Sequence, residues 1–72
     1  MTTEISSNIG NITNKLRIRR QTMNYTQAYI AGKLGISQNA YSKIESGQTN
    51  FTVKRLYEIV YILEANITDF IQ

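Results

Sequence analysis

Residues 27–45 read QAYIAGKLGISQNAYSKIE, and this stretch decides the fold. Within it Ile30 and Leu34 lie four positions apart and Tyr41 and Ile44 three positions apart, which is the spacing of one face of an α-helix. Gly35 interrupts the pattern where a turn between two helices needs a left-handed backbone, and Ala31 is small where the two helices have to touch. The stretch therefore predicts two short helices joined by a tight turn. The residues expected to face a core are Ile30, Leu34, Ile36, Tyr41 and Ile44.

Polar residues mark where these two helices begin. Thr26 and Ser37 stand at N-cap positions, where a side-chain oxygen accepts a hydrogen bond from the first helical turn. We therefore expect helices over residues 27–34 and 38–46, with Gly47 closing the second one.

Three further helices are expected around this pair, over residues 8–22, over residues 53–64 after the cap Thr52, and over residues 67–71 after the cap Asn66. The expected core faces are Ile9, Ile12, Leu16 and Met23 in the first and Val53, Leu56, Ile59, Val60 and Leu63 in the fourth. No alternating strand pattern is visible. The expected fold class is all-α, a compact five-helix domain over residues 8–72, with a flexible N-terminus over residues 1–7.

The composition excludes several kinds of site. The 72 residues contain no cysteine and no histidine, so we expect no disulfide, no metal and no cofactor. No pair of carboxylates has catalytic spacing, so we expect no enzyme. No apolar run approaches the ~20 residues that span a bilayer, and no signal peptide is visible, so we expect a cytoplasmic protein that does not bind membranes.

The charges are unevenly distributed along the chain. All eight basic residues lie between Lys15 and Arg55, and Glu45 is the only acid among them, so this segment has a net charge of +7. From Leu56 onwards there are three acids and no base. Clustered positive charge attracts phosphate, so the distribution favours nucleic acid as a partner.

Two short helices with this turn form the helix-turn-helix, which holds its second helix in the major groove of DNA. Anchoring that helix through Ile36 and Ile44 leaves its other face free. The free face carries Gln38, Asn39, Ser42 and Lys43. Gln and Asn pair with adenine and Lys reaches guanine, while the hydroxyls of Ser37 and Ser42 can donate to phosphates. These side chains are the candidates for contacting DNA.

Many positions match one family in register. They are Arg20, Thr26, Gln27, Ala31, Leu34, Gly35, Ile36, Ser37, Gln38, Ser42, Ile44, Glu45, Gly47, Leu56, Ile59 and Leu63. From Ile9 to Ile71 the chain resembles the Cro/phage-repressor (XRE-type) helix-turn-helix family. The resemblance implies a lambda-repressor-like DNA-binding domain.

The resemblance also implies roles for single residues. Gln38, Asn39 and Lys43 would read bases, and Gln27 would hold a phosphate and buttress the first reading residue; we add Ser42, on the same free face, to the base-reading candidates. Asn50, Lys54 and Arg55, near the start of the fourth helix, would meet the DNA backbone together with Ser37. Arg20 and Glu45 would form an ion pair between the first and third helices.

Three positions depart from the family pattern. Arg19 stands where leucine is usual, which leaves open whether Arg19 or Arg20 pairs with Glu45. Tyr29 replaces a glutamate in the first turn of the second helix, so a capping box is absent there. Phe51 replaces a common proline and is either a hydrophobic staple or an exposed contact.

Two tyrosines, Tyr57 and Tyr61, lie one turn apart beside the core stripe of the fourth helix. They form either the edge of the core or, with Phe70 and Ile71, a self-association surface.

The function implied is sequence-specific DNA binding by a transcriptional regulator, a homodimeric repressor on a palindromic operator. The alternative is an antitoxin that neutralises a toxin partner by protein contact and represses its own operon. The sequence leaves the operator, the regulated genes and the choice between activation and repression open.

Overall fold

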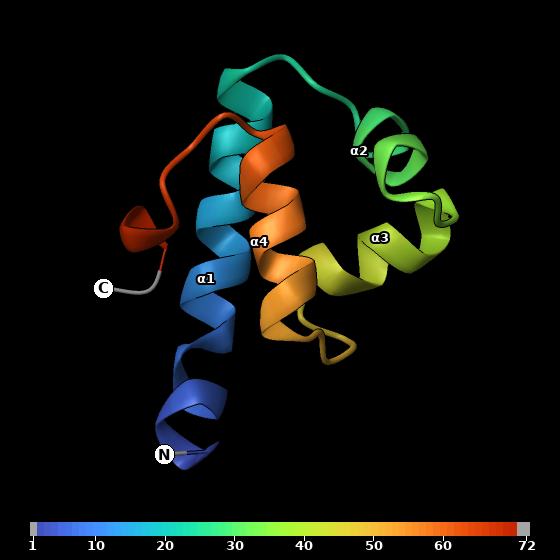
Figure 1. Cartoon of the computed structure of the whole chain (residues 1–72). Coiled ribbons are helices and arrows are strands. Elements are labelled where there is room, and N and C mark those ends of the chain that lie inside the picture. The colour runs from blue at the N-terminus through green and yellow to red at the C-terminus, as the bar shows by residue number, and fades with distance from the viewer. Residues whose placement is uncertain (1, 71–72) are drawn as a thin grey trace.

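A computed structural model describes the backbone of residues 2–70 and the side chains from Gly10 onwards. Four α-helices and one short 3-10 helix occur in this range (Figure 1). They are α1 (Thr2–Thr22), α2 (Gln27–Leu34), α3 (Gln38–Glu45), α4 (Val53–Ile62) and η1 (Ile67–Asp69). No strand occurs in this part of the chain. The all-α fold class is confirmed.

Both ends of the chain differ from the expectation. Helix α1 begins at Thr2 and not near residue 8, because neither proline nor glycine interrupts the chain before Gly10. The flexibility expected for residues 1–7 stays a prediction. The expected fifth helix is a single 3-10 turn, because the Asn66 side chain makes no capping hydrogen bond and the segment is too short to continue. The five-helix count was therefore wrong.

The predicted N-caps of α2 and α3 and the predicted glycine turn between them are confirmed. Thr26 Oγ1 accepts from Tyr29 N, and Ser37 Oγ accepts from Ala40 N, both at 3.0 Å. Gly35 has a φ of 72° and therefore makes the left-handed turn that the sequence predicted. Its neighbour Ile36 donates from its backbone N to Ala31 O at 3.0 Å, which satisfies a carbonyl at the end of α2. These bonds fix the angle at which α3 leaves α2.

One apolar core joins α1, α2, α3, α4 and the C-terminal turn, and the largest completely buried side chains are Leu16, Ile30, Tyr41, Ile59 and Leu63. The buried face of α4 is shorter than expected, since Val53 is 65 % exposed. Val53 is the first residue of the helix and lies beyond the residues that pack against the core. Met23, Leu34 and Ile36 are only partly buried, whereas the side chain of Ile9 lies outside the described residues. Phe51 is partly buried against the core, as a hydrophobic staple would be.

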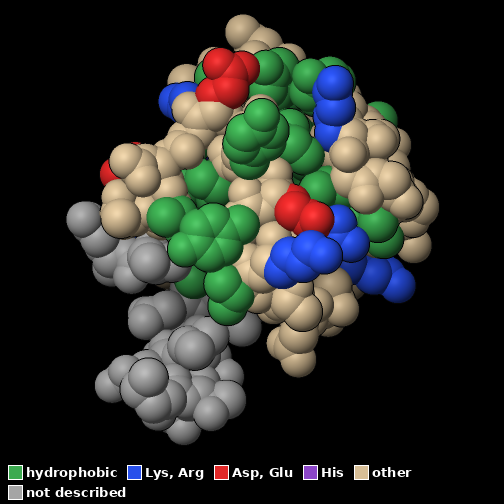
Figure 2. Space-filling model, viewed as in Figure 1, with side chains coloured by type: hydrophobic (Ala, Val, Ile, Leu, Met, Phe, Trp, Pro, Cys, Tyr) green, Lys and Arg blue, Asp and Glu red, His purple; other side chains and the backbone are tan. Residues whose placement is uncertain are grey.

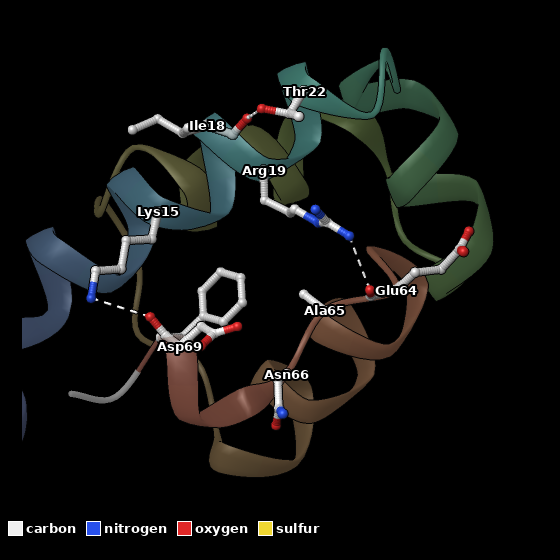
Figure 3. Close-up of a pocket in the computed structure, with 9 residues that line it drawn as sticks. Lys15, Ile18, Arg19, Thr22, Glu64, Ala65, Asn66 and Asp69 are labelled. Atoms are coloured by element: carbon white, nitrogen blue, oxygen red, sulfur yellow. Dashed lines mark hydrogen bonds between the residues drawn. The ribbon is translucent and has the colours of Figure 1, made fainter.

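Arg19 fastens the end of α4 to α1. Its Nε donates to Leu63 O at 3.0 Å. Its Nη2 donates to Glu64 O at 3.0 Å, and Lys15 Nζ donates to Asp69 O at 3.2 Å (Figure 3). The guanidinium thus satisfies carbonyls that a helix end leaves without partners. Arg19 therefore acts as a cap for α4, which explains why an arginine is acceptable in a slot where leucine is usual.

Candidate DNA interface

Helix α3 has a buried face and an exposed face that differ sharply in chemistry. Its inner face holds Tyr41, Ile44 and Glu45, all buried. The outer face carries the four residues proposed to read bases, of which three are exposed and Ser42 is half-buried: Gln38, Asn39, Ser42 and Lys43. No other element covers the three exposed side chains among the described residues, so they are available to a ligand.

A shallow groove connects the exposed face of α3 with the start of α4. It has a volume of about 470 Å³, and its walls include Ser37, Asn39 and Lys43 on one side and Asn50 and Arg55 on the other. Two candidate base-reading residues and three candidate phosphate-binding residues thus share one surface. Gln27, Gln38, Ser42 and Lys54 lie outside this groove.

The start of α4 presents a helix N-terminus beside this groove. Thr52 Oγ1 accepts from Arg55 N at 3.0 Å, and Lys54 is exposed. Arg55 Nη1 pairs with Glu58 Oε1 at 3.1 Å, so part of its charge is already compensated. Lys54 is therefore the better placed of the two cations to meet an anion.

A buried ion pair anchors α3 from behind, and Arg20 rather than Arg19 supplies it. Arg20 Nε and Nη2 donate to the two oxygens of Glu45, both at 2.9 Å, and Arg20 Nη1 donates to Tyr25 O at 2.8 Å. The Glu45 side chain is 2 % exposed. Two parallel bonds to a planar guanidinium fix both position and orientation, so the pair sets where the C-terminal end of α3 lies against α1.

The ionisation of this pair follows from its surroundings. Burial disfavours the charge on Glu45, but Arg20, with the neighbouring Tyr41 hydroxyl and Gln27 amide, outweighs it and lowers the pKa of the carboxyl below its ordinary value. Burial, together with the nearby negative charge of Glu45, raises the pKa of the Tyr41 hydroxyl, which stays protonated; its distance and angle to Glu45 do not meet hydrogen-bond geometry. The site therefore carries one negative and one positive charge at neutral pH.

Gln27 turns inward towards this pair. Its Nε2 donates to Glu45 Oε1 at 3.2 Å, and the side chain is half-buried at the first position of α2. The family resemblance implied that Gln27 binds a DNA phosphate. The structure shows in addition a hydrogen bond within the protein, which the sequence did not reveal. Glutamine has a second N–H, so the two contacts are compatible.

The basic residues do not all face one surface. Lys15 and Arg19 bind carbonyls near the C-terminal turn, and Arg20 is neutralised by Glu45. On the face shown in Figure 2, most basic side chains gather on the half where α2 and α3 lie in Figure 1. The charge that remains for a ligand is smaller than the +7 of the segment.

The residues of the expected self-association surface do not lie together: two are exposed and one is buried. Tyr57 and Tyr61 are 53 % and 84 % exposed, and hydrophobic side chains gather over α4 in Figure 2. Phe70 is instead 4 % exposed within the core, because the C-terminal turn folds back onto α1. Ile71 lies outside the described residues.

Neither a metal cluster nor a membrane span was found in the part of the chain that was searched. The side chains that the structure describes, from Gly10 to Phe70, include no group of three or more His, Cys, Asp or Glu that could hold a metal ion. The helices there are too short or too polar to cross a bilayer.

Comparison with known proteins agrees with this geometry. A helix-turn-helix family model matches residues 16–70. The cryptic phage CTXphi transcriptional repressor RstR of Vibrio cholerae is 38 % identical over 58 residues, which are 81 % of this chain and 52 % of the repressor. Antitoxin HipB of Escherichia coli is 32 % identical over 57 residues, which are 79 % of this chain and 65 % of the antitoxin.

The chain thus spans between half and two thirds of these relatives. No solved structure matches it. The family match covers α2, the turn and α3, whose exposed face carries the candidate base-reading residues. The chain belongs to the XRE-type helix-turn-helix family of DNA-binding regulators.

Proposed function

We propose that the chain is a sequence-specific DNA-binding repressor that lays α3 in the major groove. The observation that carries this proposal is the contrast within α3, whose inner face is fixed by a buried ion pair while Gln38, Asn39 and Lys43 are exposed on its outer face. A helix held so firmly presents its outer side chains in a defined register. A defined register is what reading a base sequence requires.

The residue types suit the contacts proposed for them. The amides of Gln38 and Asn39 can each bond N6 and N7 of an adenine, and Lys43 can reach O6 and N7 of a guanine. Contacts to the DNA backbone come from Ser37, Asn50 and Lys54, with Arg55 contributing the charge that Glu58 leaves uncompensated. The mechanism is occupancy of a promoter, which blocks its use.

The two contact classes predict different mutant behaviour. Gln38→Ala or Lys43→Ala should weaken binding to the cognate site by about 1–3 kcal/mol and affect random DNA little. Lys54→Ala should weaken both alike and reduce the salt slope by about 1. Fluorescence anisotropy with cognate and scrambled duplexes measures both effects, and Lys15→Ala serves as a control because that lysine binds Asp69 O. Swapped behaviour of the two classes would mean that another face docks.

A homodimer is part of the proposal. The exposed side chains of Tyr57 and Tyr61 line a shallow groove of about 620 Å³ that Lys33 and Glu58 also line. In a two-fold interface, Lys33 of one copy would meet Glu58 of the other, which is already paired with Arg55 of its own chain, so the groove holds charges of both signs. Aromatic side chains of this kind are enriched in interfaces.

The dimer surface can be tested without DNA. Tyr57→Ser together with Tyr61→Ser should convert dimers to monomers in analytical ultracentrifugation and leave the fold intact, because both rings are more than half exposed. Ile18→Ser is the control, since Ile18 is an exposed apolar residue outside this groove. An unchanged sedimentation coefficient in the double variant would contradict this placement of the interface.

The second candidate function is that of an antitoxin. It is favoured by the similarity to HipB, which is named an antitoxin. Such a chain would bind a toxin by protein contact and also repress its own operon. Co-expression with the product of a neighbouring gene, followed by purification, distinguishes the two, since a repressor alone would retain no partner.

A further inference from the structure

The buried ion pair has a third member that joins it to the surface of the protein. Glu45 Oε1 accepts from Arg20 Nη2 at 2.9 Å and from Gln27 Nε2 at 3.2 Å. Arg20 lies in the last turn of α1, Gln27 is the first residue of α2 and Glu45 is the last residue of α3. One buried carboxylate therefore links three helices, and its two partners, Arg20 and Gln27, are both partly exposed to solvent.

The bond to Glu45 determines which way round the Gln27 amide lies. Its NH₂ group points to the carboxylate, because the reverse orientation would place the amide oxygen against an anion. One N–H is used in this way. The second N–H and the carbonyl oxygen have no hydrogen-bond partner among the described residues. The amide is thus held in one orientation with a donor left over.

We infer that Glu45 is a positioning residue for DNA binding, because it orients the Gln27 amide so that the second N–H donates to a DNA phosphate. The inference rests on the proposed docking of α3 in the groove. Its consequence is that the single acid within the basic segment supports DNA binding, although its charge alone would oppose it. An amide held in place before binding loses less conformational freedom when the contact forms.

The test is a double-mutant cycle on DNA affinity with Gln27→Ala, Glu45→Gln and both together, at a temperature where circular dichroism shows each variant folded. Gln27→Ala should weaken binding about tenfold, which corresponds to about 1.4 kcal/mol. Glu45→Gln should weaken it at least as much. In the Gln27→Ala background, however, the factor by which Glu45→Gln weakens DNA binding should be about three- to tenfold smaller, because the phosphate contact that Glu45 positions is already absent.

Two controls separate positioning from a general loss of structure. Arg20→Lys disturbs the same ion pair but does not touch Gln27, so its effect should combine with that of Gln27→Ala within about twofold. Affinities are measured on the cognate duplex and on a scrambled one. A phosphate contact is independent of sequence, so the coupling between positions 27 and 45 should be equal on both duplexes.

Three results would overturn the inference. Independent effects of Gln27→Ala and Glu45→Gln would show that Glu45 does not act through Gln27, while DNA binding by the wild-type chain would leave the proposed function standing. Coupling on the cognate duplex alone would mean that Gln27 serves base reading and not a phosphate. A wild-type chain that binds neither duplex would overturn both this inference and the proposed function.

Discussion

Glu45→Gln is expected to lower the free energy of unfolding by about 3–5 kcal/mol, because it leaves the guanidinium of Arg20, whose side chain is only 12 % exposed, without its counter-charge. Arg20→Met should cost as much or more, since the stranded Glu45 carboxylate is 2 % exposed. The double variant should recover part of the loss, because no charge then remains unpaired. Urea denaturation followed by circular dichroism measures all three.

The chain offers a matched control for this prediction. Arg55 and Glu58 form a second ion pair at 3.1 Å, but their side chains are 31 % and 42 % exposed. Solvent screens such a pair, so Glu58→Gln should change the unfolding free energy by less than about 1 kcal/mol. Equal and additive sub-kcal/mol effects at both pairs would contradict the account of α3 as a helix anchored from the inside.

The same carboxylate predicts how stability depends on pH. Its pKa in the folded chain lies below the ordinary value of glutamate, so the native state binds fewer protons at this site than the unfolded state does. The contribution of Glu45 is therefore complete above the ordinary pKa of about 4.3 and disappears as the pH falls through the lower, folded value. Glu45→Gln should flatten this acid limb of the stability curve, measured as unfolding midpoints between about pH 2 and pH 7.

Affinity for the cognate operator is expected to fall by about 10³-fold or more between 50 and 200 mM salt. The estimate assumes that a dimer neutralises about six phosphates or more and releases the ions that they had bound. It lies at the lower end of the range for such contacts, because Lys15, Arg19 and Arg20 are engaged within the protein. Anisotropy titrations over four salt concentrations give the slope directly.

A variant separates ligand contacts from charge in general. Lys54→Ala and Lys15→Ala remove the same net charge, but only Lys54 lies at the start of α4. The slope should decrease for the first and stay unchanged for the second. A salt dependence that is flat in the wild-type chain would contradict docking against the DNA backbone.

The sequence was sufficient for features that depend on near neighbours. Thr26, Ser37 and Thr52 each cap a helix through a bond to a backbone N–H three residues on, and Gly35 turns the chain by its own φ. Such interactions depend on spacing alone, so the arrangement of α2, turn and α3 could be predicted.

Features that depend on distant contacts could not be predicted in the same way. Arg19 caps carbonyls 44 and 45 residues further along the chain, and this bond also explains why it is Arg20 that pairs with Glu45. The burial of Phe70 and the exposure of Val53 likewise depend on how the C-terminal turn and α4 pack. The inward bond of Gln27 spans 18 residues and has no local signature.

The most direct measurement of the central claim is selection of bound DNA from a random pool by the wild-type chain and by Lys43→Ala. The account predicts that the wild-type chain enriches one palindromic sequence whose half-site centres lie about 34–36 Å apart or a multiple of that distance. Lys43→Ala should relax the preference at one position of each half-site and leave the spacing unchanged. A pool in which no sequence is enriched, or an identical preference in the two proteins, would contradict base reading by α3.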